Sequence, residues 1–405
     1  MMRSRKNRLN PQSPNVWRTH NVWAFSLASL FSDWGHEMVT ALLPGLLTAM
    51  GAPAIALGLT EGISNLAQSW AALWGGRETA RYEGRHRVLR LGYLLTGLKA
   101  LMALVSWWPL VVLLRTAAWL GRGARGPIRD AYIAEEVPPE HVGKAYGLRE
   151  TFDTAGALLG PLTAAILVTF YGPRTLIALA AIPAAITVIL IMRVHKLPPQ
   201  PNPVSEGSPR GNISWPKTFV RYRAATGIFT AGYLAPTFFI LQVWRSHVAW
   251  GPLSAHTIAL VLYTWHNAVY AAGAYPAGRF ADRTRGRTLL LTGYAMWAVA
   301  VLGFALNPAS IALWFVLFGA TGLSTGIIEV GQRMVTVRVV AVPTRGQGLG
   351  QIAAVRGIGQ LLASVVMGVL WTLSNPRVGF GIEAGLACMG LMTMIWAVGT
   401  DGMAG

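Results

Sequence analysis

The stretch Gly278-Arg279-Phe280-Ala281-Asp282-Arg283-Thr284-Arg285-Gly286-Arg287 lies between two long apolar segments in the second half of the chain. A related stretch occupies the same place in the first half and reads Gly76-Arg77-Glu78-Thr79-Ala80-Arg81-Tyr82-Glu83-Gly84-Arg85. Charges this dense do not lie in hydrocarbon, so each copy predicts a short loop between membrane segments. A repeat of half the chain indicates two copies of one folding unit, which is typical of secondary transporters.

The composition indicates a membrane protein. The chain has 405 residues, of which 53% are hydrophobic and only 12% are charged, whereas an ordinary soluble domain carries about 25% charged residues. A transmembrane helix needs about 20 apolar residues. Twelve such segments are predicted, at residues 22–50, 54–74, 88–106, 109–134, 143–170, 175–192, 219–244, 255–277, 288–305, 309–333, 346–372 and 378–398.

We therefore expect an all-α membrane protein whose twelve transmembrane helices form two six-helix bundles. The bundles are predicted at residues 1–192 and 219–405, and a proline-rich cytoplasmic linker at 193–218 joins them. The first apolar stretch is long and has no small-residue cleavage site, so we expect no cleavable signal. The single cysteine, Cys388, excludes a disulfide framework and a thiolate metal site.

The net charge of +18 is unevenly distributed. Arginines and lysines gather near the N-terminus, in both copies of the repeated stretch and in the linker, which all lie on one side of the membrane in the predicted topology. This is the positive-inside pattern, and it predicts a multi-pass protein of the cytoplasmic (inner) membrane with both termini in the cytoplasm. The pattern argues against a surface that binds nucleic acid.

The repeated stretch resembles the signature loop of the major facilitator superfamily, which places a glycine before an aspartate–arginine pair and a glycine–arginine pair after it. The second copy matches this signature, whereas the first copy has Ala80 at the aspartate position. Residues 121–131 and 147–156 further resemble a group of bacterial and archaeal facilitators with few assigned substrates. The resemblance implies transport by alternating access without a cofactor. The matching residues of the second copy are Gly278, Asp282, Arg283, Gly286 and Arg287, and Arg77 and Arg81 are the arginines of the first.

Charged residues inside predicted crossings are candidates for function, because a charge at the bilayer centre costs about 2.5–3.5 kcal/mol on insertion scales. The resemblance implies that helices 1, 2, 4 and 5 line the cavity of the first bundle, and most of the charges lie in these helices. The candidates for the proton-coupling site and substrate cavity are Asp33, His36, Glu37, Glu61 and Arg122, with His266 in the second bundle, where it can equally serve as a polar packing element.

Two interpretations remain open for these charges. Asp33 and Glu37 share one helix face, and a carboxylate that is partly removed from water can exchange protons near neutrality. Arg122 opposite them can couple proton binding to substrate binding, although a purely structural pairing is the alternative. The remaining charges are expected to form an ion-pair network that gates the inner mouth, and comprise Arg125, Arg129, Asp130, Arg149, Glu150 and Asp153.

Three further features have predicted roles. The resemblance associates Gly156-x-x-x-Gly160-Pro161 in helix 5 with exporters, although close helix packing is the ordinary explanation. Lys99 is expected to reach a carboxylate of the first bundle. In the second bundle, the polar residues predicted to pair with one another at the inner gate are Glu329, Gln332, Arg333 and Arg356.

The leading hypothesis is a proton-coupled exporter of small organic molecules, whose partners are the substrate, protons and the lipid bilayer. A divalent metal transporter for iron or manganese is the alternative, since Asp33, His36 and Glu37 offer carboxylate and imidazole ligands. A non-transporting sensor or assembly factor is a third possibility. An enzyme is not expected, because no nucleophile, base and orienting residue occur together.

Overall fold

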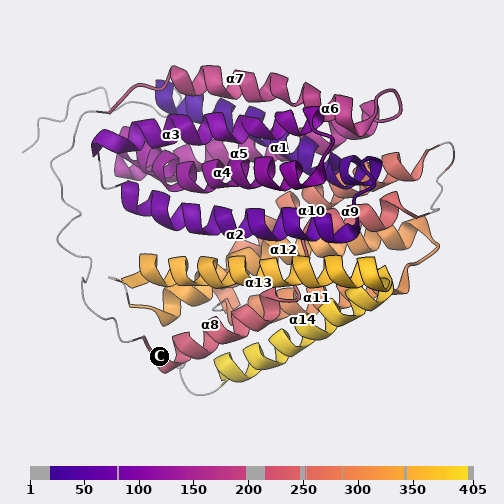
Figure 1. Cartoon of the computed structure of the whole chain (residues 1–405). Coiled ribbons are helices and arrows are strands. Elements are labelled where there is room, and N and C mark those ends of the chain that lie inside the picture. The colour runs from indigo at the N-terminus through magenta and orange to yellow at the C-terminus, as the bar shows by residue number, and fades with distance from the viewer. Residues whose placement is uncertain are drawn as a thin grey trace, which may run out of the picture.

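A computed structural model describes residues 19–79, 82–197, 215–246, 251, 253–284, 286–341 and 344–399, and these ranges are almost entirely helical. The helices run side by side, with α1–α7 on one side of the molecule and α8–α14 on the other (Figure 1). We call the end of the bundle at which α1 begins and α14 ends the terminal end. The other end is the opposite end.

The helices of the first half begin and end close to the predicted boundaries. They are α1 (His20–Ala49), α2 (Ala54–Glu78), α3 (Tyr82–Thr96) with the 3-10 helix η2 (Gly97–Leu104), α4 (Trp108–Glu136), the short 3-10 helix η3 (Pro139–His141), α5 (Val142–Leu167), α6 (Pro173–Leu179) and α7 (Ala181–Met192). Those of the second half are α8 (Lys217–Thr230), α9 (Pro236–Trp244), α10 (Ala255–Thr284), α11 (Arg287–Leu306), α12 (Ile311–Val339), α13 (Arg345–Leu373) and α14 (Pro376–Gly399).

Five helical stretches among the described residues are both long enough and apolar enough to cross a membrane: 173–192, 287–306, 311–339, 345–373 and 376–397. The crossing count of twelve therefore stays a prediction. The long helices of the first half fall short of this criterion for a physical reason. They carry the charged residues, and α4 alone contains Arg115, Arg122, Arg125 and Arg129.

The predicted segment 219–244 is not one continuous helix. It is divided into α8 and α9, which are separated by the residues between Thr230 and Pro236. Proline lacks an N–H group, and it disfavours helical geometry in the residue before it. The break leaves backbone groups without helical partners, and the indole Nε1 of Trp297 donates to the carbonyl oxygen of Gly232 at 3.0 Å. A partner from α11 thus stabilises the break.

Two other predicted segments are also divided. The segment 175–192 is interrupted at Ala180, between α6 and α7, where Pro183 cannot donate to the carbonyl of Leu179. The segment 88–106 starts earlier than predicted and ends as the 3-10 helix η2.

The repeated charged stretches are mostly helical and not loops, which corrects the prediction. The first copy forms the end of α2 and the start of α3, and the second continues α10 as far as Thr284. Helices that extend beyond the hydrocarbon can carry charges in the polar region. The chain turns at Gly286, whose φ of +74° suits a residue without a Cβ atom. Arg81 and Arg285 lie outside the described residues, as do the side chains of Asp282 and Arg283.

Glycines allow the helices to approach closely within and between the halves. In the first half, a Cβ atom at Gly156 of α5 would lie 2.2 Å from the carbonyl oxygen of Leu30 in α1. Between the halves, a Cβ atom at Gly58 of α2 would lie 2.2 Å from the carbonyl oxygen of Ser364 in α13. Gly58 lies near the start of α2, so the two halves are in contact at the opposite end.

Candidate functional site

Asp33 of α1 and Arg122 of α4 form a salt bridge inside the first half. The two carboxylate oxygens of Asp33 accept hydrogen bonds from Nη1 and Nη2 of Arg122 at 2.5 and 3.1 Å. The Asp33 side chain is 6% exposed and that of Arg122 is 24% exposed. Charge-assisted hydrogen bonds in this two-pronged geometry are strong and directional. The structure thus brings together a carboxylate and an arginine that the sequence analysis placed in one cavity.

Glu37, one turn further along α1, contacts the other half of the molecule. Its Oε2 atom accepts a hydrogen bond of 2.6 Å from the hydroxyl of Tyr263 in α10. A second link lies nearby, since the amide nitrogen of Asn267 donates to the backbone carbonyl of Ala157 in α5 at 3.1 Å. The neighbouring carboxylates of α1 therefore differ in their partners: Asp33 binds within its own half, and Glu37 binds across the interface.

His36 does not join these carboxylates in a ligand set. Its ring stacks on Trp119 with the ring centroids 4.2 Å apart, and its Nε2 atom lies 3.9 Å from Oε1 of Glu37. Asp33 is turned to Arg122 and Glu37 to Tyr263. Throughout the described ranges, no group of three or more His, Cys, Asp or Glu side chains is placed to hold a metal ion. The metal-transport alternative thus has no described ligand set.

Glu61 forms a buried ion pair with Arg115 of α4, a contact that the sequence analysis did not predict. Its Oε1 atom accepts a hydrogen bond of 2.6 Å from Nη2 of Arg115, and both side chains are almost fully buried. The Arg115 guanidinium also lies over the Trp119 ring, 4.0 Å from its centroid. The close packing of α2 on α4 brings the two side chains together. This pair holds α2 against α4.

A polar cavity of about 360 Å³ lies beyond Arg122, towards the terminal end. Two local ion-pair groups line it: Arg129 with Asp130 at 2.9 Å, and Arg149 with Glu150 and, at 3.3 Å, Asp153. The residues predicted to form the gating network therefore line one polar cavity. The cavity is lined by Gln68, Arg122, Arg125, Gly126, Arg129, Asp130, Arg149, Glu150, Asp153 and Arg333.

Arg125 differs from the other arginines of this cavity. It is 3% exposed, and its Nη2 atom donates to the Ser32 hydroxyl at 2.7 Å. Its guanidinium lies over the Tyr93 ring, 3.7 Å from the centroid. The Nε and Nη1 atoms have no hydrogen-bond partner among the described residues. Arg125 is thus a buried cation that neutral groups alone contact.

Lys99 reaches no carboxylate in the part of the chain that the structure describes, contrary to the prediction. Its ammonium donates to the backbone carbonyl oxygen of Ser32 at 3.2 Å, in the turn of α1 that precedes Asp33. Geometry explains the difference, because Arg122 already occupies both oxygens of Asp33. Lys99 adds a second buried cation behind the same wall of the cavity.

The predicted cluster at the inner end of α12 forms only in part. Arg356 lies 3.7 Å from Glu329, which also accepts a hydrogen bond from the hydroxyl of Tyr270 at 2.9 Å. Gln332 instead donates to Tyr294, and Arg333 lines the polar cavity. Among the described residues, only Glu329 and Arg356 of the predicted cluster therefore pair with each other.

The remaining candidates that the structure describes do not line the polar cavity. His266 is buried against α12, where its Nδ1 atom lies 3.0 Å from the hydroxyl oxygen of Thr321. Arg77 is exposed at the end of α2. The helix-5 residues Gly156 and Gly160 pack directly on α1, and Pro161 lies within the continuous helix α5. The surroundings of Gly278 and the side chains of Asp282 and Arg283 lie outside the described part of the chain.

Tyr263 was not among the predicted site residues, although the sequence holds a signal for it. Tyr263, Asn267 and Tyr270 are spaced by four and three residues and therefore share one face of α10. Their polar atoms bind Glu37, the carbonyl of Ala157 and Glu329 respectively. A search for polar residues with helical spacing would have identified this face.

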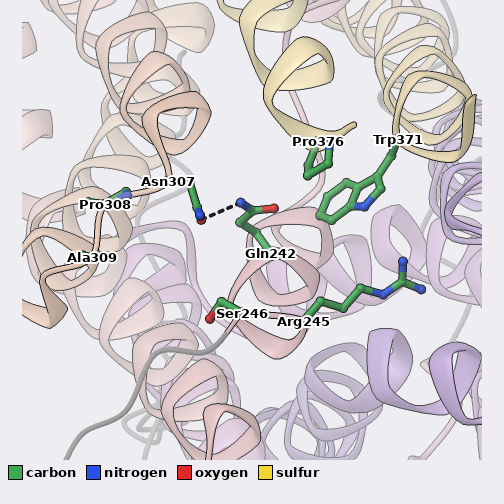
Figure 2. Close-up of a pocket in the computed structure, with 8 residues that line it drawn as sticks. All are labelled: Gln242, Arg245, Ser246, Asn307, Pro308, Ala309, Trp371 and Pro376. Carbon is green, nitrogen blue, oxygen red and sulfur yellow. Dashed lines mark hydrogen bonds between the residues drawn. The ribbon is translucent and has the colours of Figure 1, made fainter. Parts of the chain in front are cut away.

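A second pocket, of about 450 Å³, lies at the opposite end of the second half (Figure 2). The amide nitrogen of Gln242 in α9 donates a hydrogen bond of 2.8 Å to the side-chain oxygen of Asn307. Arg245 and Trp371 also line the pocket (Figure 2). Among the described residues that line it, Arg245 alone is charged. The pocket lacks the facing charges of the polar cavity, so we do not place the functional site there.

Comparison with known proteins gives a consistent result. The family model described as Major Facilitator Superfamily matches residues 25–260 and 224–402. An uncharacterised MFS-type transporter of Methanocaldococcus jannaschii is 28% identical over 366 residues, which cover 89% of this chain and 90% of that protein. A multidrug resistance protein of Aeromonas hydrophila is 22% identical over 344 residues, 81% of this chain and 82% of that protein.

Solved structures share the fold. A bacterial homologue of the human lysosomal transporter Spinster, in an inward-facing and occupied conformation, superimposes with a TM-score of 0.75. The match covers 96% of this chain and 98% of that chain at 14% sequence identity. At this identity the likeness concerns the arrangement of the helices alone.

Proposed function

Because the chain belongs to the Major Facilitator Superfamily, and is therefore a transport protein and not an enzyme, we propose that it is a proton-coupled exporter of small organic molecules. In this proposal twelve transmembrane helices form two six-helix bundles, residues 1–192 and 219–405, in the cytoplasmic (inner) membrane with both termini in the cytoplasm. The bundles rock about a site between them and expose it to each side in turn.

One observation carries the proton-coupling part of the proposal: two carboxylates one turn apart on α1 have partners in different halves. Asp33 binds Arg122 of its own half, and Glu37 binds Tyr263 of the other half. Protonation of Glu37 removes the charge that strengthens the hydrogen bond from Tyr263. Because this bond exists only when the halves are close together at this point, proton binding changes the relative stability of the two conformations.

Arg122 connects this proton site to the substrate. It binds Asp33 and lines the polar cavity at the same time. A substrate that attracts the guanidinium competes with Asp33 for it and so changes the proton affinity of Asp33. Substrate and proton binding are thereby linked, and such linkage is reciprocal.

Two observations support export as the direction. The Gly156–Pro161 motif, which the sequence analysis associated with exporters, packs α5 directly on the turn of α1 that carries Asp33. The relative from Aeromonas hydrophila is named a multidrug resistance protein, which is consistent with export of organic molecules.

The test uses energised inverted membrane vesicles that contain the wild-type protein, D33N, E37Q or the control variant E140Q. Glu140 lies in the exposed 3-10 helix η3, away from the cavity. E140Q therefore shows whether the loss of an unrelated carboxylate changes proton efflux. Lumenal pH is recorded while a panel of small organic molecules is added. We expect substrate-triggered proton efflux in the wild type and in E140Q, and none in D33N or E37Q.

The same experiment can contradict the proposal. Proton efflux of wild-type size in both D33N and E37Q would exclude these carboxylates as the proton carriers. Efflux that is also triggered in vesicles without the protein would have another source. Folded protein in each sample is verified by size-exclusion chromatography in detergent.

A further inference from the structure

The charges around the polar cavity are not balanced. Three of its arginines have carboxylate partners: Asp33 for Arg122, Asp130 for Arg129, and the acidic residues of α5 for Arg149. Arg125 of α4 and Arg333 of α12 line the same space, and neither forms an ion pair within the described residues. The ammonium of Lys99 is buried behind Ser32, and its one hydrogen bond among the described residues goes to a backbone carbonyl. The cavity therefore carries an excess of positive charge.

Arg125 is the most informative member of this set. A buried charge is costly unless a partner of opposite charge and further hydrogen bonds offset the loss of water. Arg125 is 3% exposed but contacts only a hydroxyl and an aromatic ring, and two of its nitrogen atoms have no described hydrogen-bond partner. Its planar guanidinium is suited to bind a carboxylate or a phosphate with two hydrogen bonds.

We propose that the polar cavity is an anion site, which binds the carboxylate or phosphate group of a small organic substrate between Arg125 and Arg333. The proposal rests on the transport function proposed above and names the chemical class of the substrate. At about 360 Å³ the cavity is at the small end of the range for ligand pockets, so it suits a small organic anion better than a large lipophilic drug.

The position of the two arginines links anion binding to conformational change. Arg125 belongs to α4 of the first half and Arg333 to α12 of the second. An anion held between them bonds to both halves and favours the conformation in which they are close together on this side. Arg122 lies one turn from Arg125 on α4, so the same anion also competes with Asp33 for the Arg122 guanidinium.

The test measures binding to the purified protein in lipid nanodiscs by isothermal titration calorimetry, in a buffer without multivalent anions. Four probes are compared: benzoate, its neutral isostere benzamide, the cation benzylammonium, and inorganic phosphate. We expect benzoate, phosphate or both to bind, and benzamide and benzylammonium not to bind. The ratio of benzoate to phosphate affinity shows which anionic group the site prefers.

Variants locate the binding site. R125Q and R333Q each remove one proposed charge, and we expect anion affinity to fall at least about tenfold in each, as for the loss of a hydrogen bond to a charged group. R338Q is the matched control, because Arg338 is exposed on the same helix as Arg333 and does not line the cavity. R125K preserves the charge but not the planar fork, so its affinity should lie between those of wild type and R125Q.

Specific outcomes overturn the proposal. These are benzamide binding as tightly as benzoate, anion affinity unchanged in both R125Q and R333Q, or no binding of either anion to folded wild-type protein. If R125Q does not fold, R333Q and the selectivity of the wild type among the four probes still decide the question. The assay uses no proton gradient, so failure of proton coupling in vesicles and failure of anion binding are separate results.

Discussion

Replacing Gly156 with alanine tests the contact between α5 and α1 that positions the carboxylates. The added Cβ atom would lie 2.2 Å from the carbonyl oxygen of Leu30 and 2.9 Å from the backbone nitrogen of Trp34. Ordinary contact begins at 3.4 Å, so the two helices must separate by about 1 Å at this point, where only backbone atoms are available to move. Overpacking of this kind costs about 1–3 kcal/mol.

The displacement also reaches the site. Asp33 lies between Leu30 and Trp34 on α1. A displacement of α1 at this point therefore changes the hydrogen bond between Asp33 and Arg122, which is 2.5 Å long. A shift of about 1 Å at a reacting centre can reduce a rate on the order of 100-fold. We therefore expect G156A to unfold more easily than wild type and to lose most of its substrate-triggered proton efflux.

The assay is unfolding of the purified protein by heat and by denaturant, followed by intrinsic tryptophan fluorescence, with G147A as the matched control. Gly147 is exposed on the same helix, and a Cβ atom there meets nothing within 4 Å. Alanine at this position should be neutral or stabilising by about 0.5–1 kcal/mol. Stability and efflux of G156A equal to those of G147A would refute the reasoning.

Three further predictions concern other buried contacts. E61Q leaves the charge of Arg115 without its partner and should cost about 3–5 kcal/mol of stability; an unfolding midpoint equal to wild type would show that the pair contributes nothing. Glu383 of α14 is fully buried, and neither carboxylate oxygen has a described hydrogen-bond partner. E383Q should therefore be as stable as wild type or more stable by about 1 kcal/mol, and a lower unfolding midpoint would contradict this. G58L inserts a side chain between α2 and α13, so we expect electron-paramagnetic-resonance distances between the halves to lengthen at the opposite end. The control is G76L, because a Cβ atom at Gly76 of the same helix meets nothing within 4 Å, and equal distances in both variants would disprove the effect.

The interrupted segment 219–244 shows where sequence reasoning ends. In the sequence, Pro236 marks a place where the helix can break. However, Pro44, Pro127 and Pro161 lie inside helices that continue through them. A proline removes one hydrogen bond in every case. Whether the chain bends or separates depends on partners for the freed backbone groups, and the indole of Trp297 is such a partner only because α11 packs beside the break.

For the candidate site, too, the sequence predicts some features and leaves others to the tertiary structure. Apolar length, the repeated charged stretch and the concentration of charges in the first half predict a helical membrane protein with a polar interior, since charges in a crossing must avoid lipid. The family resemblance assigns α1 and α4, and with α4 Arg122, to the cavity, and spacing along α1 places Asp33 and Glu37 on one helix face. Neither predicts that Glu61 is bound to Arg115 or that Glu37 reaches across to Tyr263.

By itself, the sequence determined the helical membrane fold, the approximate ends of its helices and the residues whose charge excludes them from lipid. These properties depend on local composition and on the periodicity of a single helix. Only the tertiary structure decided which carboxylate binds which arginine and which arginine has no carboxylate partner. The partners lie far apart in the chain, 89 positions for Asp33 and Arg122, and the close packing of helices at glycine contacts brings them together.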